Sequence, residues 1–419
     1  DSYARVKRVI DTNRYALALR WTALDPENQS VVGLLEMNRA KDLDSFKAAI
    51  HKNYAPMQNV VMADTDGNIA YQAAGVAPKR TLHQGLYGIA PAPGWDPQYD
   101  WNGYLPFDQL PNISNPEQGW IATANQAVTA LNNPNPLTAD WDVPTRYDRI
   151  VQLINAKSTF DLQYMKTMQG DTLSLGATPL LELFKSSKTT HLLGAKTLDL
   201  IQKFDGNMSV DSPGALIFNA WADHLTRNVF SRLSYLFFDN YGARNFRYPL
   251  IAVLQNPNSP WCDIPKTPAI ETCAESSNIA FDRALEYLSK QYGSDPSSWA
   301  WGKAHIAISE HRPLSKIPVL GKLFNITTPF PGDSFSINVG RLELNNSSNP
   351  YETLQAPSLR AIYDLSDLEK SLFIYQSGQS GWVQSPWYRN MNSLWAKNEY
   401  LPLQMKPEKT ARTLELSNK

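Results

Sequence analysis

The residues with the clearest chemical potential lie in the segment Trp120–Gln126, which reads Trp-Ile-Ala-Thr-Ala-Asn-Gln. The apolar run Trp120–Ala124 follows a turn, and it predicts a short strand that presents the side chain of Asn125 at its end. An amide N–H donor suits a developing oxyanion, and removing one such donor typically raises a reaction barrier by about 3 kcal/mol. An asparagine at a strand end is more often a turn or capping residue. The residues alone therefore leave Asn125 with two interpretations, an oxyanion donor and a structural amide.

Other groups that could act as nucleophiles or metal ligands are poorly arranged. Ser380 lies in Gly-Gln-Ser-Gly-Trp, where Trp382 replaces the last glycine of the pattern Gly-x-Ser-x-Gly, so a tight turn is the better interpretation. His305 and His311 have a spacing that puts them on different helix faces, and the zinc pattern HExxH is absent. We interpret both histidines as surface or structural residues. The sequence also has no glycine pattern for binding phosphate or a dinucleotide.

The chain has two cysteines, Cys262 and Cys273, separated by a segment that contains two prolines and no regular periodicity. They could be buried free thiols, whereas a metal site would need a histidine or a CxxC pair that this segment lacks. We predict a disulfide that pins the loop, which in the chain-entropy description stabilises the fold by roughly 3 kcal/mol. A disulfide would place the protein in an oxidising compartment.

The elements that must position these residues begin with a strand-rich region. Tyr15–Trp21 alternates in part between apolar and polar residues, which predicts a half-buried strand. Two short helical patterns lie between residues 31 and 52, and Asp42 is placed to cap the second. Two strand-like runs within residues 59–74 are joined through an Asp-Gly turn, which predicts a β-hairpin.

The middle of the chain is mainly helical, and its end returns to strands. Apolar residues recur at three- and four-residue spacing in the middle, whereas 334–339, 360–364 and 372–376 read as strands. This order predicts an α+β fold in which a helical insertion interrupts the sheet-forming parts. The predicted segments are 1–158 (strand-rich core with Asn125), 159–330 (mainly helical insertion) and 331–419 (strands and helix returning to the core).

Composition and charge exclude several classes of function. The 419 residues are 42% hydrophobic and 19% charged, as in an ordinary globular protein, and the formal net charge is −1. No basic face suited to phosphate backbones is visible, so nucleic acid is not an expected partner. No apolar run approaches the roughly 20 residues that span a bilayer. The sequence starts at Asp1 without a signal peptide, and we expect this start to result from processing or from the choice of the expressed segment.

A set of short motifs extends from the predicted hairpin to the C-terminal part of the chain. The motifs are Asn59–Ile69, Tyr99–Phe107, Asn115–Gly119, Ile121–Asn125, Pro144–Arg146, Ser358–Asp364 and Gly378–Tyr388. In this order they resemble the penicillin acylase family, which includes acyl-homoserine-lactone acylases. Their combination is specific, although each motif alone is weak. The resemblance implies the larger, C-terminal part of the family's β chain. The implied fold is part of an N-terminal-nucleophile hydrolase αββα sandwich with a helical insertion.

The resemblance also implies roles for individual residues. Asn125 corresponds to the oxyanion-hole asparagine of the family, and Arg146 to an arginine that positions the substrate and the catalytic amide. Gln58 falls where a residue lining the acyl pocket lies. Asp140 lies near the position of a calcium-ligating aspartate, although its spacing to Arg146 differs. The resemblance thus implies a structural Ca²⁺. It implies no cofactor for catalysis. Gln126 stands where the family usually has asparagine, which could alter the support of Asn125.

The implied function is amide hydrolysis of the penicillin acylase type. Such an enzyme cleaves an acyl side chain from an amide such as a β-lactam or an N-acyl-homoserine lactone. Its nucleophile is a serine that becomes the first residue of the β chain by self-cleavage, and the α-amine of that serine acts as the base. Asp1 does not match this serine, and Ser2 is second. We therefore expect the nucleophile-bearing segment and a small α chain on other polypeptides, and we expect residues 1–419 alone to be inactive.

The same resemblance implies a zymogen that matures in the periplasm or outside the cell. Its two substrate classes correspond to two roles, antibiotic resistance and quorum quenching, and the sequence leaves both open. The alternative to an enzyme is a non-catalytic fragment that binds acyl compounds or acts as a scaffold for its partner chain.

Overall fold

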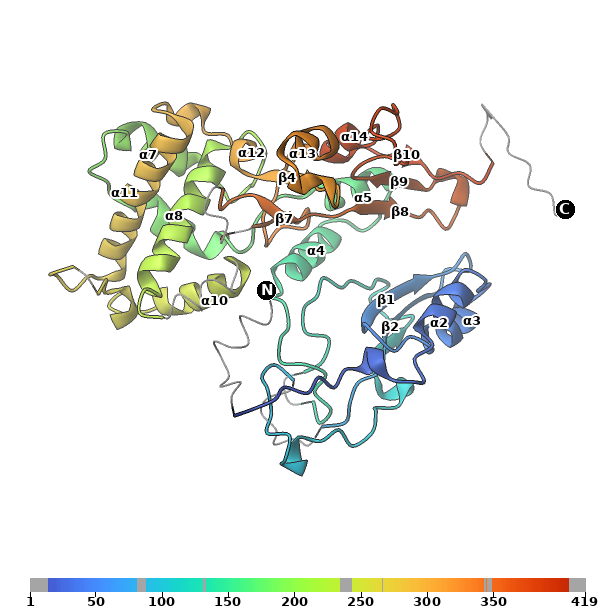
Figure 1. Cartoon of the computed structure of the whole chain (residues 1–419). Coiled ribbons are helices and arrows are strands. Elements are labelled where there is room, and N and C mark those ends of the chain that lie inside the picture. Colours follow the sequence, from blue (N-terminus) through green and yellow to red (C-terminus); the bar gives the residue numbers. More distant parts are fainter. Residues whose placement is uncertain are drawn as a thin grey trace. The chain divides into compact units, whose positions relative to one another are not determined.

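The fold is described by a computed structural model that covers residues 14–80, 88–130, 133–233, 243–265, 267–342, 344 and 349–406. By compactness the chain divides into two units, Asp1–Pro144 and Thr145–Lys419. Unit 1 runs from blue to blue-green in Figure 1, and unit 2 runs from green to red. The predicted division at residues 158 and 330 follows the order of helices and strands and not compactness, and it stays a prediction.

In its described residues, unit 1 contains a three-stranded antiparallel sheet and the α-helices α2 and α3. The sheet has the order β1-β2-β3, so β2 pairs with both neighbours. The helices pack on each other, and α3 also packs on β2 (Figure 1). The elements are η1 (Thr22–Leu24), α2 (Ser30–Met37), α3 (Leu43–Ile50), β1 (Gln58–Ala63), β2 (Ile69–Ala74), η2 (Pro97–Tyr99), η3 (Phe107–Gln109) and β3 (Asn112–Ser114).

The β1–β2 hairpin forms at the predicted Asp-Gly turn. Oδ1 of Asp64 accepts hydrogen bonds from the backbone N–H groups of Asp66 (3.0 Å) and Asn68 (2.8 Å), which holds the turn together. Gly67 has a φ of +89°, a left-handed conformation that glycine adopts without a steric penalty. The hairpin prediction is therefore confirmed.

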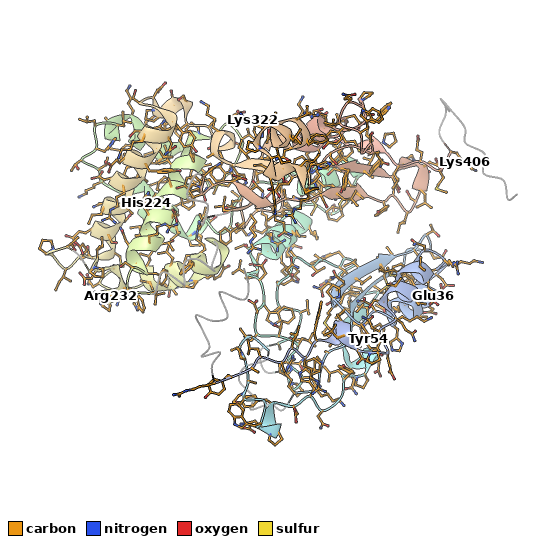
Figure 2. The ribbon with its side chains drawn as sticks, viewed as in Figure 1. Glu36, Tyr54, His224, Arg232, Lys322 and Lys406 are labelled. Carbon is orange, nitrogen blue, oxygen red and sulfur yellow. A yellow bond between two sulfur atoms is a disulfide. The ribbon has the colours of Figure 1, made fainter. Side chains whose placement is uncertain are left out.

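Local hydrogen bonds also fix the two helices of unit 1. Asp42 caps α3, as predicted, because its Oδ1 atom accepts a hydrogen bond of 2.8 Å from the backbone N–H of Ser45. Oγ of Ser30, at the start of α2, accepts one of 2.9 Å from the backbone N–H of Tyr54, which is labelled in Figure 2. This bond ties α2 to the chain that follows α3.

The central strand β2 is covered on both faces and buried along nearly its whole length, whereas β3 is exposed. The face toward α3, here called the helix face, has a cluster that contains Ile50, Met62, Ala70 and Ala74. The opposite face, here called the loop face, has a cluster that contains Tyr71, Ala73, Ala77, Leu105 and Leu110.

The described part of unit 2 contains a group of helices and two small sheets. The sheets have the orders β5-β4-β7-β6 and β10-β9-β8, and the pair β4–β7 is parallel. The helical elements are α4 (Thr145–Asn155), α5 (Leu162–Gln169), η4 (Thr178–Leu180), α6 (Leu181–Lys185), α7 (Gly194–Lys203), α8 (Pro213–Val229), α10 (Ala243–Leu254), η5 (Pro260–Cys262), α11 (Cys273–Tyr292), η6 (Pro296–Ser298), α12 (Trp301–Ala304), η7 (Leu314–Lys316), α13 (Pro318–Phe324), η8 (Leu368–Lys370) and α14 (Asn392–Ala396). The strands are β4 (Ile306–Ser309), β5 (Ile326–Pro329), β6 (Arg341–Leu342), β7 (Thr353–Gln355), β8 (Leu359–Ile362), β9 (Leu372–Tyr375) and β10 (Leu401–Pro402).

Helices α8 and α11 lie side by side (Figure 1), and α6, α7, α10 and α12 pack on one or the other of them. Phe184 of α6 fills the centre, and its ring centroid lies 5.1–6.2 Å from the rings of Phe218, Trp221 and Phe281. Aromatic groups in such contacts bury large apolar areas. The predicted helical middle is thus confirmed within the described residues. None of the helices described is long and apolar enough to cross a membrane.

A disulfide fixes the start of α11. Cys262 and Cys273 are bonded to each other, as predicted, and both are buried in the helical core. Cys273 is the first residue of α11, and Thr272 and Glu275 form a capping box at the same point. The covalent bond and the cap together determine where α11 begins.

Two segments that were predicted as strands are irregular. Tyr15–Trp21 has no regular structure, and Leu19 within it is 76% exposed, so the prediction was wrong. The segment 334–339 forms turns, because the backbone N–H of Phe335 donates to Oδ1 of Asp333 and the N–H of Asp333 donates to Oγ of Ser336, each at 2.8 Å. The strands predicted at 360–364 and 372–376 are present as β8 and β9.

Two buried charged side chains connect distant parts of unit 2. The carboxylate of Asp333 is fully buried and accepts a hydrogen bond of 2.6 Å from the hydroxyl of Ser174. The guanidinium of Arg360, in β8, donates to Oδ1 of Asn338 at 2.7 Å and to the backbone carbonyl of Trp395 at 3.0 Å. The turn at 333–338 therefore contacts both the helical part and the β10-β9-β8 sheet region.

His305 is a structural histidine, as the sequence suggested. It is fully buried, its ring stacks on Trp301 with centroids 4.5 Å apart, and its Nδ1 lies 2.8 Å from the carbonyl oxygen of Tyr351. Burial lowers the pKa of His305 from 6.5 to about 4. The ring is therefore neutral at pH 7 in the folded protein.

We predict that His305 makes the fold sensitive to acid. Between pH 6.5 and 4, His305 binds a proton in the unfolded chain but not in the folded protein. The contribution of neutral His305 to the free energy of unfolding is therefore complete above pH 6.5 and decreases as the pH falls below it. The loss across this range should be about 3 kcal/mol in the free energy of unfolding. Urea denaturation at pH 7.0 and 4.5, in the native protein and in His305→Gln, tests this. Equal losses in the two proteins would contradict the prediction.

Candidate functional site

Asn125 lies on an exposed turn of unit 1. The segment Trp120–Ala124 is not a strand, so that prediction was wrong, and the chain bends at residues 124–126. Asn125 has a φ of +70°, a left-handed conformation that costs most residues about 1 kcal/mol or more and that asparagine tolerates best after glycine. Its side chain therefore leaves the backbone in a direction that an extended strand would not give.

Apolar side chains anchor this turn on the loop face of the sheet. Ile121 and Val128, which come before and after Asn125, both pack against the cluster that contains Tyr71 and Ala73. The apolar character that suggested a strand thus reflects packing onto the sheet and not strand pairing. The exposed residue Asn125 consequently lies between two partly buried anchors.

Two hydrogen bonds hold the backbone of the turn. Oε1 of Gln126 accepts a bond of 2.7 Å from the N–H of Ala124, and the carbonyl of Asn125 accepts one of 3.1 Å from the N–H of Asp142. Gln126 thus stabilises the turn. This is the position where the family usually has asparagine, and where the sequence suggested a different support for Asn125. An amide with a fixed direction and access to solvent can donate to an oxyanion that forms on a bound substrate.

Gln58 is exposed at the first position of β1. Because side chains alternate along a strand, Gln58 shares the helix face with Val60 and Met62, whereas the Asn125 turn packs on the loop face. The structure therefore does not bring Gln58 and Asn125 to the same face of the sheet. The role of Gln58 in an acyl pocket stays a prediction.

The polar pair on the loop face is Asn59 and Tyr71, which sequence reasoning did not single out. The hydroxyl of Tyr71 donates a hydrogen bond of 2.6 Å to Oδ1 of Asn59, and burial raises the pKa of Tyr71 to about 12. Tyr71 is therefore neutral at pH 7 and acts as a hydrogen-bond donor. The alternation of residues along β1 was the signal that could have identified Asn59.

Asp140 does not by itself fit a calcium site. It is exposed, and its backbone N–H donates to Oγ1 of Thr138 at 3.0 Å. In the part of the chain that the structure describes, no group of three or more His, Cys, Asp or Glu side chains is placed to hold a metal ion. Calcium prefers six to eight oxygen ligands, and a single carboxylate does not supply them. The role of Asp140 as a calcium ligand therefore stays a prediction.

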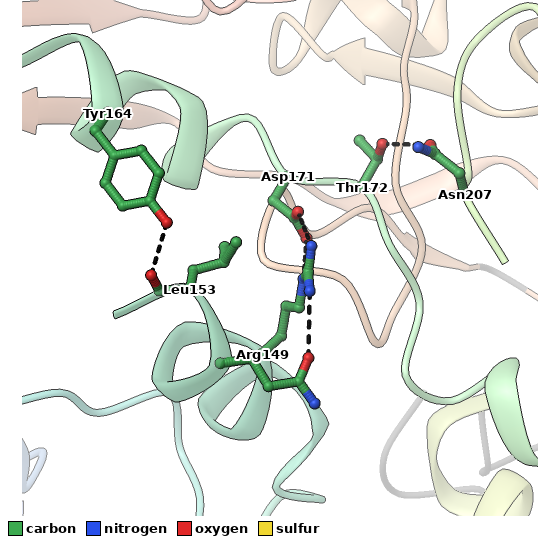
Figure 3. A network of polar contacts seen from close by, with 7 residues as sticks. Arg149, Leu153, Tyr164, Asp171, Thr172 and Asn207 are labelled. Carbon is green, nitrogen blue, oxygen red and sulfur yellow. Dashed lines mark hydrogen bonds and ion pairs between the residues drawn. The ribbon is translucent and has the colours of Figure 1, made fainter. Parts of the chain in front are cut away.

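Arg146 lies in unit 2, at the second position of α4, and is partly buried. One turn further along the same helix, Arg149 forms a bidentate ion pair with Asp171, with Nε–Oδ1 and Nη2–Oδ2 distances of 3.0 and 2.8 Å (Figure 3). The hydroxyl of Tyr164 adds a bond of 2.6 Å to the carbonyl of Leu153. These contacts fix α4, and hence the backbone of Arg146, within unit 2.

Ser380 and the buried His305 do not form a nucleophilic pair. The N–H of Ser380 donates to the carbonyl of Trp387 at 3.2 Å, and Oγ of Ser380 accepts from the N–H of Trp382 at 3.1 Å. These bonds belong to a local turn, as predicted. His305 bonds instead to the backbone of Tyr351.

We predict that the Arg149–Asp171 pair stabilises unit 2. Its side chains are only 20% and 14% exposed, so Asp171→Ala should lower the free energy of unfolding by about 2 kcal/mol, as expected for a hydrogen-bonded charged group. The matched control is Asp199→Ala, which removes the exposed pair with Lys203 and should cost less than about 0.5 kcal/mol. Urea denaturation measures both losses in the free energy of unfolding. Equal losses would show that the Arg149–Asp171 pair in Figure 3 stabilises the fold no more than an exposed pair does.

Comparisons with known proteins give a consistent result. The family model described as penicillin amidase matches residues 6–412. The acyl-homoserine lactone acylase QuiP of Pseudomonas aeruginosa is 26% identical over 438 aligned positions, covering 95% of this chain and 50% of the relative. The penicillin acylase 2 proenzyme of Pseudomonas sp. strain SE83 is 25% identical, covering 82% of this chain and 44% of the relative. The chain thus spans about half the length of the curated relatives it matches.

A solved structure shares the fold. The thermostable penicillin G acylase from Alcaligenes faecalis aligns with a TM-score of 0.62 at 18% identity, covering 95% of this chain and 74% of the other. At this level of identity the match shows the fold alone. It confirms the predicted α+β fold, which the chain shares with this penicillin G acylase.

Proposed function

The chain belongs to the penicillin amidase family, and we propose that the complete protein hydrolyses the amide bond between an acyl chain and an amine. The observation that carries this proposal is the Asn125 turn, which presents one exposed amide on a rigid, doubly covered sheet. A fixed donor of this kind stabilises the oxyanion of acyl transfer more in the transition state than in the ground state.

The proposed reaction proceeds through an acyl-enzyme. A serine Oγ from a segment outside residues 1–419 attacks the amide carbon, and the α-amine of that serine accepts the hydroxyl proton. The N–H of Asn125 stabilises the negative oxygen of the tetrahedral intermediate. The C–N bond then breaks, the amine leaves with the proton, and water hydrolyses the resulting ester to release the acid. Arg146 is proposed to help position the substrate, as the family resemblance implies.

Two substrate classes follow from the relatives. Proteins named acyl-homoserine lactone acylase and proteins named penicillin acylase are similar to this chain at nearly the same identity, 26% and 25%. We therefore propose an N-acyl-homoserine lactone or an acylated β-lactam as substrate, without preferring one. The first would serve quorum quenching and the second antibiotic resistance.

Processing and export form part of the same proposal. One relative is named a proenzyme, and we propose that the complete protein matures by cleavage into a small α chain and a β chain that begins with the nucleophile. The Cys262–Cys273 disulfide supports a periplasmic or extracellular location, because disulfides persist in oxidising compartments.

We predict that the full-length protein releases free acid from at least one of the two substrate classes. Fluorescamine detection of the released amine, with N-acyl-homoserine lactones of several chain lengths and with penicillin G, measures this. Residues 1–419 expressed alone are the control and should show no turnover. Turnover by this segment would contradict the proposed external nucleophile. Binding of acyl compounds without hydrolysis by the full-length protein would favour the non-catalytic alternative.

We predict that Asn125→Ala in the full-length protein lowers kcat about 100-fold, which corresponds to the loss of one oxyanion donor. Asn125→Asp should be at least as damaging, because it keeps the shape but replaces the N–H donor with a negative charge. The matched control is Asn115→Ala, which alters another left-handed asparagine of unit 1 without touching the turn. An unchanged kcat in Asn125→Ala would remove this residue from the mechanism.

A further inference from the structure

The backbone on either side of Asn125 is held by a different partner. Upstream, the N–H of Ala124 donates to Oε1 of Gln126 at 2.7 Å. Downstream, the carbonyl of Asn125 accepts a bond of 3.1 Å from the N–H of Asp142. The left-handed φ of +70° lies between these two restraints. Together they set the direction of the Cα–Cβ bond of Asn125 relative to its flanking peptide groups.

Gln126 supplies the only side chain in this pair of restraints. Its oxygen reaches back past Asn125 at residues 124–126, where the chain bends. The nearby hydroxyl of Thr123 does not share this task, because it is buried without a hydrogen-bond partner among the residues that the structure covers. The acceptor of Gln126 is therefore the side-chain group that holds the N–H of Ala124 on the upstream side of the turn.

We propose that Gln126 is a positioning residue for the amide hydrolysis proposed above, on which this inference rests. Gln126 fixes the direction in which Asn125 presents its N–H donor, and it acts through the backbone of Ala124 without touching the substrate. Donor direction matters because an oxyanion donor works at a hydrogen-bond distance of about 2.7–3.1 Å. A displacement of about 1 Å can lower a rate on the order of 100-fold.

The test compares two substitutions of Gln126 in the full-length protein. Gln126→Met removes the acceptor at similar size, and kcat should fall about 10- to 100-fold. KM and the urea midpoint should change little, because the anchors Ile121 and Val128 remain. Gln126→Glu restores an acceptor for the N–H of Ala124 and should recover most of kcat. The matched control is Gln118→Met, in the same segment, whose side chain donates to the carbonyl of Trp120. It should leave kcat unchanged.

A double-mutant cycle separates positioning from a general structural role. If Gln126 acts through Asn125, Gln126→Met should cause no further loss of kcat in the Asn125→Ala background. An equal fold-loss in both backgrounds, or an unchanged kcat in Gln126→Met alone, would overturn the inference. In either case a reduced kcat in Asn125→Ala would leave the proposed function intact. An unchanged kcat in Asn125→Ala would instead contradict the role of Asn125 in the proposed function.

Discussion

Strand β2 has a partner on both edges and a packed cluster on both faces, and the arrangement of unit 1 follows from this constraint. Helices α2 and α3 take the helix face, and the chain after the sheet must then cover the loop face. The Asn125 turn belongs to this cover. The sheet therefore fixes where this turn lies, and an exposed amide gains a fixed position without being buried itself.

The features that could be predicted from sequence depend on interactions between residues close in the chain. Asp64 closes its own hairpin, Asp42 caps the helix that follows it, and Cys262 and Cys273 pin one loop. Each of these residues has its partner no more than 11 positions away in the chain, so local chemistry was sufficient. The helical middle was predictable for the same reason, because its apolar spacing repeats along each helix.

The wrong predictions concern segments whose conformation depends on distant partners. Alternation in Tyr15–Trp21 did not make a strand, because a strand also needs a neighbour to pair with. The apolar character of the residues before Asn125 reflects packing on β2 and not strand pairing. In the candidate site, a single position along β1 decides whether a side chain faces the helices or the loop, so Asn59 and Gln58 differ in a way that composition does not reveal. The proposed role of Asn125 as an oxyanion donor came from the family resemblance, and its left-handed backbone came from the structure.

The bond from Asp142 to Asn125 has a consequence for biosynthesis. The sheet and its hairpin are complete in sequence by residue 114, whereas the turn at Asn125 is closed by a residue that lies just before α4. During translation the sheet can form first, and the turn cannot acquire its last restraint until Asp142 has left the ribosome. The turn at Asn125 is thus among the last features of unit 1 to be fixed, and the sheet on which it packs can already be in place when this happens.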